Sequence, residues 1–228
     1  MTEETGGVRA LSLWPPSFDA AIFDFDGTLA DSMGIWEEVD RRFLASRNIP
    51  YTDDLAREIP ALGFELGAAY VIEKFGLDET VGEICAEWTR LGSELYRARA
   101  RLRPGAEQYV RALLASGVPC AIATTNDPEV LGSLKGRLPL DELFCVQVHG
   151  CDVARSKEHP DIYLLAAERL GAAPERCCVF EDLAAGIRAA RGVGMATCGI
   201  DAHASTQQLD RVRAAADAFI DDWTDIPL

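Results

Sequence analysis

Two aspartates separated by a single residue are the first feature of this sequence that could perform chemistry. Asp24 and Asp26 follow an apolar run, residues 20–23, and a Gly-Thr pair comes directly after them. The apolar run is typical of a buried strand of a parallel sheet, and residues two apart on an extended chain point to the same side. Neighbouring carboxylates repel each other, so such pairs commonly share a hard cation such as Mg²⁺. For an isolated pair the alternative is structural: one aspartate caps a helix and the other stabilises a turn.

Two further strand-like runs, residues 118–123 and 177–180, also end in polar side chains. The polar residues that follow these runs are Thr124, Thr125, Asn126, Glu181 and Asp182. Because the carboxyl ends of parallel strands meet at one edge of a sheet, where ligands bind, we expect these groups to converge with the aspartate pair. The simpler alternative for the first cluster is that Thr125, Asn126 or Asp127 caps the next helix.

From residue 103 onward, the chain alternates between helical and strand-like patterns. Further strands are expected at residues 143–148, 195–198 and 218–220. Helices are expected at residues 105–116, 160–170, 184–191 and 205–215. Such alternation predicts an α/β fold, in which a Rossmann-like parallel sheet is wound with right-handed crossovers.

A long helical insertion interrupts this alternation after the first strand. Helical spacing covers residues 34–46, 64–75 and 79–101, and no convincing strand falls between residues 33 and 102. We therefore divide the chain into two domains. The Rossmann-like catalytic core comprises residues 1–32 and 103–228, and the inserted α-helical cap domain comprises residues 33–102.

Composition excludes several classes of partner. The 228 residues carry 22 basic and 37 acidic side chains, a net charge of −15. Nucleic acids and anionic membranes are bound by basic surfaces, so neither is an expected partner. The first 17 residues lack the apolar segment of a signal peptide, and no apolar run reaches the ~18 residues of a membrane span. We expect a cytoplasmic monomer whose seven cysteines are reduced thiols.

Four segments resemble the motifs of one known family, in the same order along the chain. The string DFDGTLADS, residues 24–32, resembles the first motif of the haloacid dehalogenase superfamily of phosphatases and phosphomutases. The strand ending in Thr124, the segment RSKEHPDIY around Lys157, and the Glu181–Asp182 pair resemble the second, third and fourth motifs. The match extends over residues 20 to about 200.

The resemblance implies a role for each polar residue of the first two motifs. It makes Asp24 the nucleophile that becomes an aspartyl-phosphate, and Asp26 the general acid and base. Thr124 would hydrogen-bond the transferring phosphoryl group, with Thr125 and Asn126 as neighbouring phosphate contacts. Since dehalogenases of the family lack the second carboxylate, Asp26 favours phosphate-ester chemistry over carbon–halogen cleavage.

The third and fourth motifs complete the site that the resemblance implies. Lys157 would pair with the nucleophile and the phosphate, although a solvated surface position is the usual location of a lysine. The implied Mg²⁺ ligands are Asp24, Asp26 (through its main-chain carbonyl), Glu181 and Asp182. This chain departs from the family pattern at two positions, since Glu158 replaces a common proline and Leu183 replaces a frequent serine.

The helical insertion is similar to the cap of the β-phosphoglucomutase-like branch of the family. That similarity implies closure over the site, hinges near residues 33–34 and 102–104, and substrate selection by a loop at residues 59–65. Mutases tend to carry a basic residue in this loop, whereas here Phe64 and Glu65 occupy it, and Phe64 could equally be a core residue. The resemblance therefore favours a Mg²⁺-dependent phosphatase of a small, sugar-phosphate-like metabolite. The alternatives are a hexose-phosphate mutase and a non-catalytic phosphate-binding protein.

Overall fold

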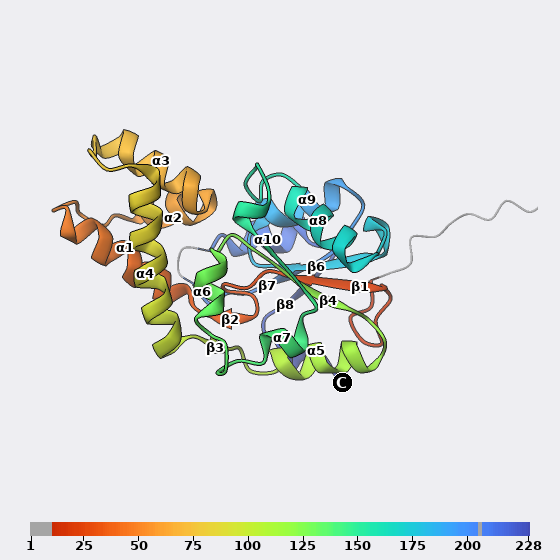
Figure 1. Ribbon diagram of the computed structural model, residues 1–228. Helices are drawn as coiled ribbons and strands as arrows, with labels where there is room; N and C mark the ends of the chain where they lie inside the picture. The colour runs from red at the N-terminus through yellow and green to blue at the C-terminus, as the bar shows by residue number, and fades with distance from the viewer. Residues whose placement is uncertain (1–10, 205–206) are drawn as a thin grey trace, which may run out of the picture.

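A six-stranded parallel sheet forms the centre of the computed structural model, which describes residues 11–204 and 207–228 (Figure 1). The strands lie in the order β5-β4-β1-β6-β7-β8. They are β1 (Ala20–Phe23), β4 (Cys120–Thr124), β5 (Val146–His149), β6 (Cys177–Glu181), β7 (Ala196–Ile200) and β8 (Ala218–Ile220). All five pairings are parallel, as the alternating sequence pattern predicts. The predicted α/β class is therefore confirmed.

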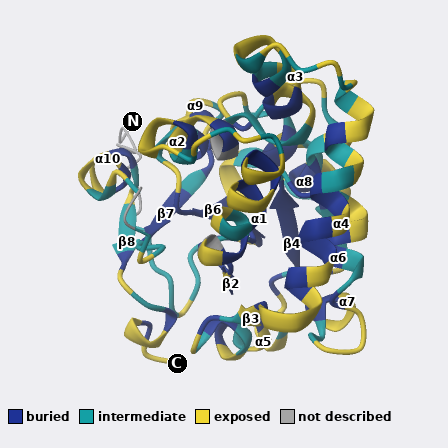
Figure 2. Cartoon of the chain, turned by 90° about the vertical axis from the view of Figure 1, so that its left-hand side faces the viewer, coloured by how far each residue is buried: buried dark blue, intermediate teal, exposed yellow. Residues whose placement is uncertain are grey.

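Two layers of helices cover the sheet (Figure 1). Alternate residues of β1 face opposite layers: Phe23 packs with the cluster that includes Tyr109, and Ile22 with the cluster that includes Tyr163. One layer contains α5 (Ala106–Ala115) and α7 (Leu140–Leu143), and the other contains α8 (Asp161–Leu170), α9 (Ala184–Gly192) and α10 (Leu209–Ala215). Because both faces are covered, the central strands are buried throughout, and Figure 2 shows β4 wholly in the buried colour.

Most of the predicted boundaries agree with the structure to within two residues, but two do not. The strand expected at residues 143–148 begins only at Val146, because Leu140 and Leu143 bury one face of a short helix with i, i+3 spacing. The helix expected at residues 205–215 begins at Leu209, and residues 205–206 lie outside the described part of the chain. Short helical turns complete this region, at α6 (Pro128–Gly132), η1 (Gly150–Asp152), η2 (Pro174–Arg176) and η3 (Trp223–Asp225).

Four helices form a separate group beside the sheet (Figure 1). They are α1 (Met33–Ser46), α2 (Asp53–Leu62), α3 (Phe64–Phe75) and α4 (Val81–Arg99). Helix α4 contacts both α1 and α3, and aromatic side chains fill the space between them. Trp88 of α4 packs edge-to-face against Phe43 of α1 and Phe64 of α3. Apolar packing therefore holds the group together, and this packing is continuous with the core on one face of the sheet.

The segment expected to be a specificity loop is largely helical. Residues 59–62 form the last turn of α2, Phe64 and Glu65 begin α3, and only Gly63 lies between the helices, at φ 75°. Helix α2 is difficult to predict from the sequence, because proline in a helix interior usually interrupts the helix and Pro60 lies within α2. At its start, the Thr52 side chain accepts a hydrogen bond from the Leu55 N–H, as an N-cap does.

A small antiparallel ribbon carries the chain into and out of the four-helix group. Strands β2 (Ala30–Asp31) and β3 (Arg101–Leu102) pair with each other, with Ala30 opposite Leu102. The expectation that no strand falls between residues 33 and 102 is therefore wrong for the last two of these residues, because α4 stops at Arg99 and strand β3 follows it. The chain therefore enters and leaves the four-helix group at the same place, beside the end of β1.

None of the helices in the described residues is both long enough and apolar enough to cross a membrane.

Candidate active site

Three carboxylates gather where β1 and β6 end. Asp24 follows β1, Glu181 is the last residue of β6, and Asp182 follows it. They converge because β1 and β6 are neighbours in the sheet, with Phe23 paired to Phe180. One oxygen from each carboxylate lies within 4.8 Å of the others, and all three residues are buried. This is the convergence that the strand-end pattern predicts.

Lys157 provides the positive charge of this cluster. Its ammonium group pairs with Asp24 Oδ1 and, at 2.9 Å, with Glu181 Oε2. The Tyr163 hydroxyl donates a second hydrogen bond to Glu181 Oε2, at 2.8 Å. Lys157 is only 5% exposed, so it is a buried, paired residue and not the solvated lysine of the alternative interpretation. The segment before α8 thus brings a cation against a carboxylate 133 residues earlier in the chain.

Burial dominates the electrostatics of the cluster. It raises the pKa of Asp24 to about 7, against the opposing charge of Lys157, and raises the pKa of Asp182 well above its usual value. Burial alone would lower the pKa of Lys157, but the charges of Asp24 and Glu181 raise it. One ammonium group therefore serves three buried carboxyls. A divalent cation, which prefers carboxylate oxygens, would restore the charge balance.

The turn after β1 is fitted closely to this cluster. Thr28 Oγ1 donates a hydrogen bond to Asp182 Oδ1 at 3.2 Å. Gly27 has φ 79°, and a Cβ at this position would lie 2.8 Å from Asp182 Oδ2. Only glycine therefore suits this turn, both for its backbone and for its contact with the acidic group.

Asp26 lies in a different network from the three clustered carboxylates. Its carboxylate accepts hydrogen bonds from Ser32 Oγ, from the Tyr96 hydroxyl and, at 2.5 Å, from Asn126 Nδ2. The Trp36 indole N–H donates to the Tyr96 hydroxyl at 2.8 Å. Burial raises the pKa of Asp26, and the hydrogen bonds that it accepts oppose this change. The Asp26 side chain is therefore held in one orientation, away from the group of possible metal ligands, and its ligand role stays a prediction for its main-chain carbonyl.

Sequence reasoning missed Tyr96 and Trp36, although both reach the site from the helical group. Trp36 is near the start of α1, and Tyr96 is near the end of α4, 70 residues after Asp26. A spacing of this length leaves no signal in the sequence. Because both residues belong to the four-helix group, they connect its position to the orientation of Asp26.

Replacing Tyr96 with Phe is expected to lower kcat about tenfold for the phosphate-ester hydrolysis that the family resemblance implies, with little change in KM. The variant removes one hydrogen bond to the carboxylate, and a bond to a charged group is worth roughly 1.5–3 kcal/mol. Tyr70→Phe is the matched control, since the Tyr70 hydroxyl bonds Glu58 on the exposed surface. Equal kinetics for the two variants would contradict a positioning role for Tyr96.

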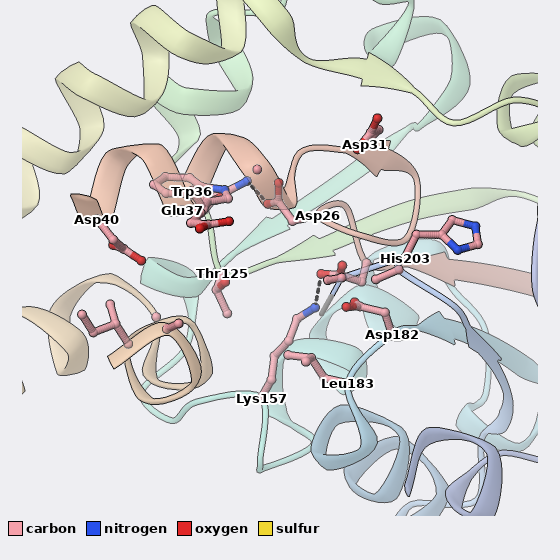
Figure 3. Close-up of a pocket in the computed structure, with 18 of the residues that line it drawn as sticks. Asp26, Asp31, Trp36, Glu37, Asp40, Thr125, Lys157, Asp182, Leu183 and His203 are labelled. Atoms are coloured by element: carbon pink, nitrogen blue, oxygen red, sulfur yellow. Dashed lines mark hydrogen bonds and ion pairs between the residues drawn. The ribbon is translucent and has the colours of Figure 1, made fainter. Parts of the chain in front are cut away.

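The residues after β4 divide structural and site roles between them. Asp127, and not Thr125 or Asn126, caps the next helix, through a 2.8 Å hydrogen bond from the Glu129 N–H. Thr124 Oγ1 accepts a hydrogen bond from the Asn126 N–H at 3.1 Å. Thr125 and Asn126 line the cavity described below, and Thr125 is labelled in Figure 3. The capping alternative is therefore confirmed for Asp127. The phosphate-contact prediction stays open for Thr124, Thr125 and Asn126.

A cavity of about 710 Å³ lies between the sheet edge and the helical group. Its volume suits a small molecule. The sheet side contributes Asp24, Asp26, Thr125, Asn126, Lys157 and Asp182. The helical side contributes Trp36, Glu37, Asp40, Tyr51, Ile59, Phe64 and Trp88. Figure 3 shows Asp40 and Glu37 on one side, Lys157 and Asp182 on the other, and Thr125 between them.

A parallel sheet with an acidic, lysine-containing site at its carboxyl edge, next to an inserted helical group, is typical of an enzyme of the α/β class that acts on a small molecule. Residues 18–194 match the family model of the haloacid dehalogenase-like hydrolases. Because that match covers more than half of the chain, the chain belongs to this family.

Several named relatives are phosphatases. The chain is 35% identical to the phosphorylated carbohydrates phosphatase of Thermotoga maritima, over 78% of this chain and 82% of the relative. It is 33% identical to hexitol phosphatase A of Escherichia coli, over 84% and 87% of the two chains. The structure of CbbY from Rhodobacter sphaeroides in complex with phosphate superposes with a TM-score of 0.79 at 25% identity, over 91% and 96% of the chains. The chain is therefore a phosphoric monoester hydrolase of the haloacid dehalogenase type.

Proposed function

We propose that this protein is a Mg²⁺-dependent phosphatase of a small, sugar-phosphate-like metabolite, acting through an aspartyl-phosphate. The observation that carries the proposal is the buried contact of Lys157 with Asp24 and Glu181. This contact places a permanent positive charge next to a carboxylate at the floor of a cavity. An incoming phosphate would meet a nucleophile whose repulsion is partly cancelled. The names of the Thermotoga and Escherichia relatives support a phosphorylated carbohydrate as the substrate class.

Asp24 and Asp26 divide the chemistry. In the first step, an Asp24 oxygen bonds to phosphorus as the ester P–O bond breaks, and Asp26 gives a proton to the leaving oxygen. In the second step, Asp26 takes a proton from water as the water oxygen attacks phosphorus and frees Asp24. The products are the alcohol and inorganic phosphate, and both carboxyl groups regain their starting protonation.

The other site residues position and neutralise the phosphoryl group. We assign Lys157 and Thr124 to its equatorial oxygens, with Thr125 and Asn126 beside them. Mg²⁺, when bound by Asp24, Glu181, Asp182 and the main-chain carbonyl of Asp26, would supply further charge stabilisation to that group. The buried carboxyls with raised pKa values support this ligand set.

The four-helix group, residues 33–102, acts in this proposal as a cap on the core formed by residues 1–32 and 103–228. The β2–β3 ribbon is its base, and Arg103 lies directly after it. The buried Arg103 side chain donates hydrogen bonds to the carbonyls of Gly27 and Asp201, at 2.7 and 2.5 Å. This anchor ties the end of the cap to the turn after β1. Closure of the cap would exclude water from the phosphoryl group.

Removal of Mg²⁺ is expected to abolish activity. Incubation with EDTA should lower phosphate release at least about 100-fold, and added Mg²⁺ should restore it, because the acidic cluster repels the substrate without a divalent cation. The measurement is inorganic phosphate released from a panel of sugar phosphates. Release that persists in EDTA would contradict the metal dependence. Interconversion of phosphohexoses without phosphate release would replace the phosphatase proposal with a mutase.

A further inference from the structure

The cap side of the cavity has a charge opposite to that expected for a phosphate-binding surface. Glu37 and Asp40, both on α1, point into it next to the aromatic residues Trp36 and Tyr51 (Figure 3 labels the first three). Arg103, Lys157 and His203 are the basic residues of the described cavity wall. All three lie on the sheet side. The half of the cavity that would receive the leaving group of the ester is therefore acidic.

Asp40 is a buried carboxylate without a partner. It is 5% exposed, and within residues 11–204 and 207–228 no group donates a hydrogen bond to it and no cation pairs with it. Burial raises its pKa to about 7, and the nearby charge of Glu37 adds to this effect. A buried carboxylate without a partner is costly, and natural structures normally pair such a group. The missing partner points to a ligand.

The cations near Asp40 are committed to other groups. Arg41 bonds the Glu37 carboxylate at 2.6 Å and lies over the Tyr51 ring, with its guanidinium 4.3 Å from the ring centroid. On the sheet side, Lys157 is paired with Asp24, and Arg103 bonds main-chain carbonyls. No described basic side chain is therefore available to neutralise Asp40 when the cavity is empty.

Aromatic side chains surround the same part of the cavity. Trp36 and Trp88 each pack edge-to-face against Phe64, with centroids 5.5 and 6.0 Å apart. The Trp88 indole N–H is buried and has no acceptor among the described residues. Ring faces attract cations. The aromatic lining therefore matches a ligand that carries a positive charge.

We propose that Asp40, assisted by Glu37 and the surrounding rings, binds a protonated amine on the leaving group of the phosphate ester. The substrate class is then a phosphorylated amino sugar or amino alcohol. A second phosphate on the substrate would be repelled by Asp40, whose charge no described cation compensates. A neutral hydroxyl could donate a hydrogen bond to Asp40 but would leave its charge uncompensated. This inference rests on the proposed function for the position of the phosphate, and it adds the identity of the other end of the substrate.

Binding to an inactive protein tests the inference directly. The Asp24→Asn protein, with Mg²⁺, is titrated by calorimetry with three matched pairs of esters. The pairs are glucosamine 6-phosphate with glucose 6-phosphate, glucosamine 1-phosphate with glucose 1-phosphate, and O-phosphoethanolamine with 2-hydroxyethyl phosphate. In at least one pair, the amine is expected to bind about tenfold or more tightly than its hydroxyl counterpart. Equal affinities within all three pairs, or no measurable binding, would overturn the proposal.

Two variants identify the group responsible. Asp40→Asn, added to the Asp24→Asn protein, keeps the shape of the side chain and removes its charge. It should abolish the preference for the amine and leave the affinity for the hydroxyl ester within about threefold of that of the Asp24→Asn protein. Glu37→Gln should reduce the preference in part. Glu38→Gln is the matched control, because this substitution also removes one negative charge from α1. Glu38 itself pairs with Arg42 and lies outside the cavity. Loss of the preference in the control, or its persistence without Asp40, would contradict the assignment.

The results expected if the phosphatase proposal is wrong differ from those expected if the amine subsite is wrong. A wild-type protein that releases no phosphate from any ester, but whose Asp24→Asn form still prefers the amine through Asp40, would refute the phosphatase and sustain the amine subsite. Robust phosphate release with no preference for amines would sustain the phosphatase and refute the subsite. The two conclusions are therefore tested by independent measurements.

Discussion

Asp24→Asn is expected to abolish turnover, with kcat at least about 10⁴-fold below that of the wild type, a loss typical of removing a nucleophile. The amide cannot form the aspartyl-phosphate, so no later step can occur. The measurement is phosphate release under saturating Mg²⁺. Mass spectrometry of acid-quenched protein should detect one added phosphoryl group on the wild type and none on the variant.

The fold should tolerate this change. Asn has the shape of Asp, and burial raises the pKa of Asp24 to about 7, so the variant removes a charge that the folded protein accommodates poorly. Lys157 retains its contact with Glu181. Asp19→Asn is the matched control, since Asp19 pairs with Arg176 at an exposed position. Full activity of the Asp24 variant, or a phosphoryl group on a different residue, would refute the mechanism.

Asp26→Asn is expected to lower kcat for a sugar phosphate by roughly 10²–10⁴-fold, the range in which general acid–base catalysis contributes. The size of the loss should depend on the leaving group. A sugar alkoxide needs the proton that Asp26 supplies, whereas the leaving group of p-nitrophenyl phosphate is stable without one. The second step needs Asp26 as a base with either ester. The variant should therefore accumulate aspartyl-phosphate.

Rapid mixing with p-nitrophenyl phosphate measures this accumulation. A burst of about one p-nitrophenol per protein, followed by slow turnover, is the expected result. Asp31→Asn is the control, because Asp31 also lines the cavity but is exposed and lies outside the hydrogen-bond network of Asp26. Equal losses with both esters and no burst would indicate that Asp26 does not act as the acid and base.

Local patterns were sufficient to predict the sheet and the cluster at its edge. The strands at residues 20–23 and 218–220 were predicted with the boundaries that the structure has. Buried parallel strands are continuous apolar runs whose carboxyl ends lie at one edge of the sheet, so the sequence predicts Asp24, Glu181 and Asp182 at the same edge. Their close approach depends on the adjacency of β1 and β6, which the structure shows. The family motifs added Lys157, and in the structure this lysine is buried and paired with Asp24.

Local patterns were less reliable where helix and turn signals conflict. Residues 59–62, the last turn of α2, were expected to belong to a loop, because the family resemblance implies a specificity loop at residues 59–65. Pro60 and Gly63, which commonly interrupt helices, gave no contrary signal. Leu143 was assigned to a strand because a short apolar run does not distinguish a strand from a buried helical turn. In the second segment, burial of Leu140 and Leu143 outweighs the local preference.

Only the tertiary structure determines which side chains of the four-helix group face the site. Trp36, Asp40 and Tyr96 lie on amphipathic helices, where the sequence pattern predicts burial but does not identify the surface that each residue meets. That surface depends on how α1 and α4 pack together and on where the β2–β3 ribbon places them beside the sheet. Asp26 therefore has its donors, and Asp40 has none among the residues that the structure describes, because of contacts between segments far apart in the sequence. The sequence by itself determined the acidic edge of the sheet, since neighbouring strands must bring their ends together, whereas the substrate-facing side of the cavity depends on helix packing.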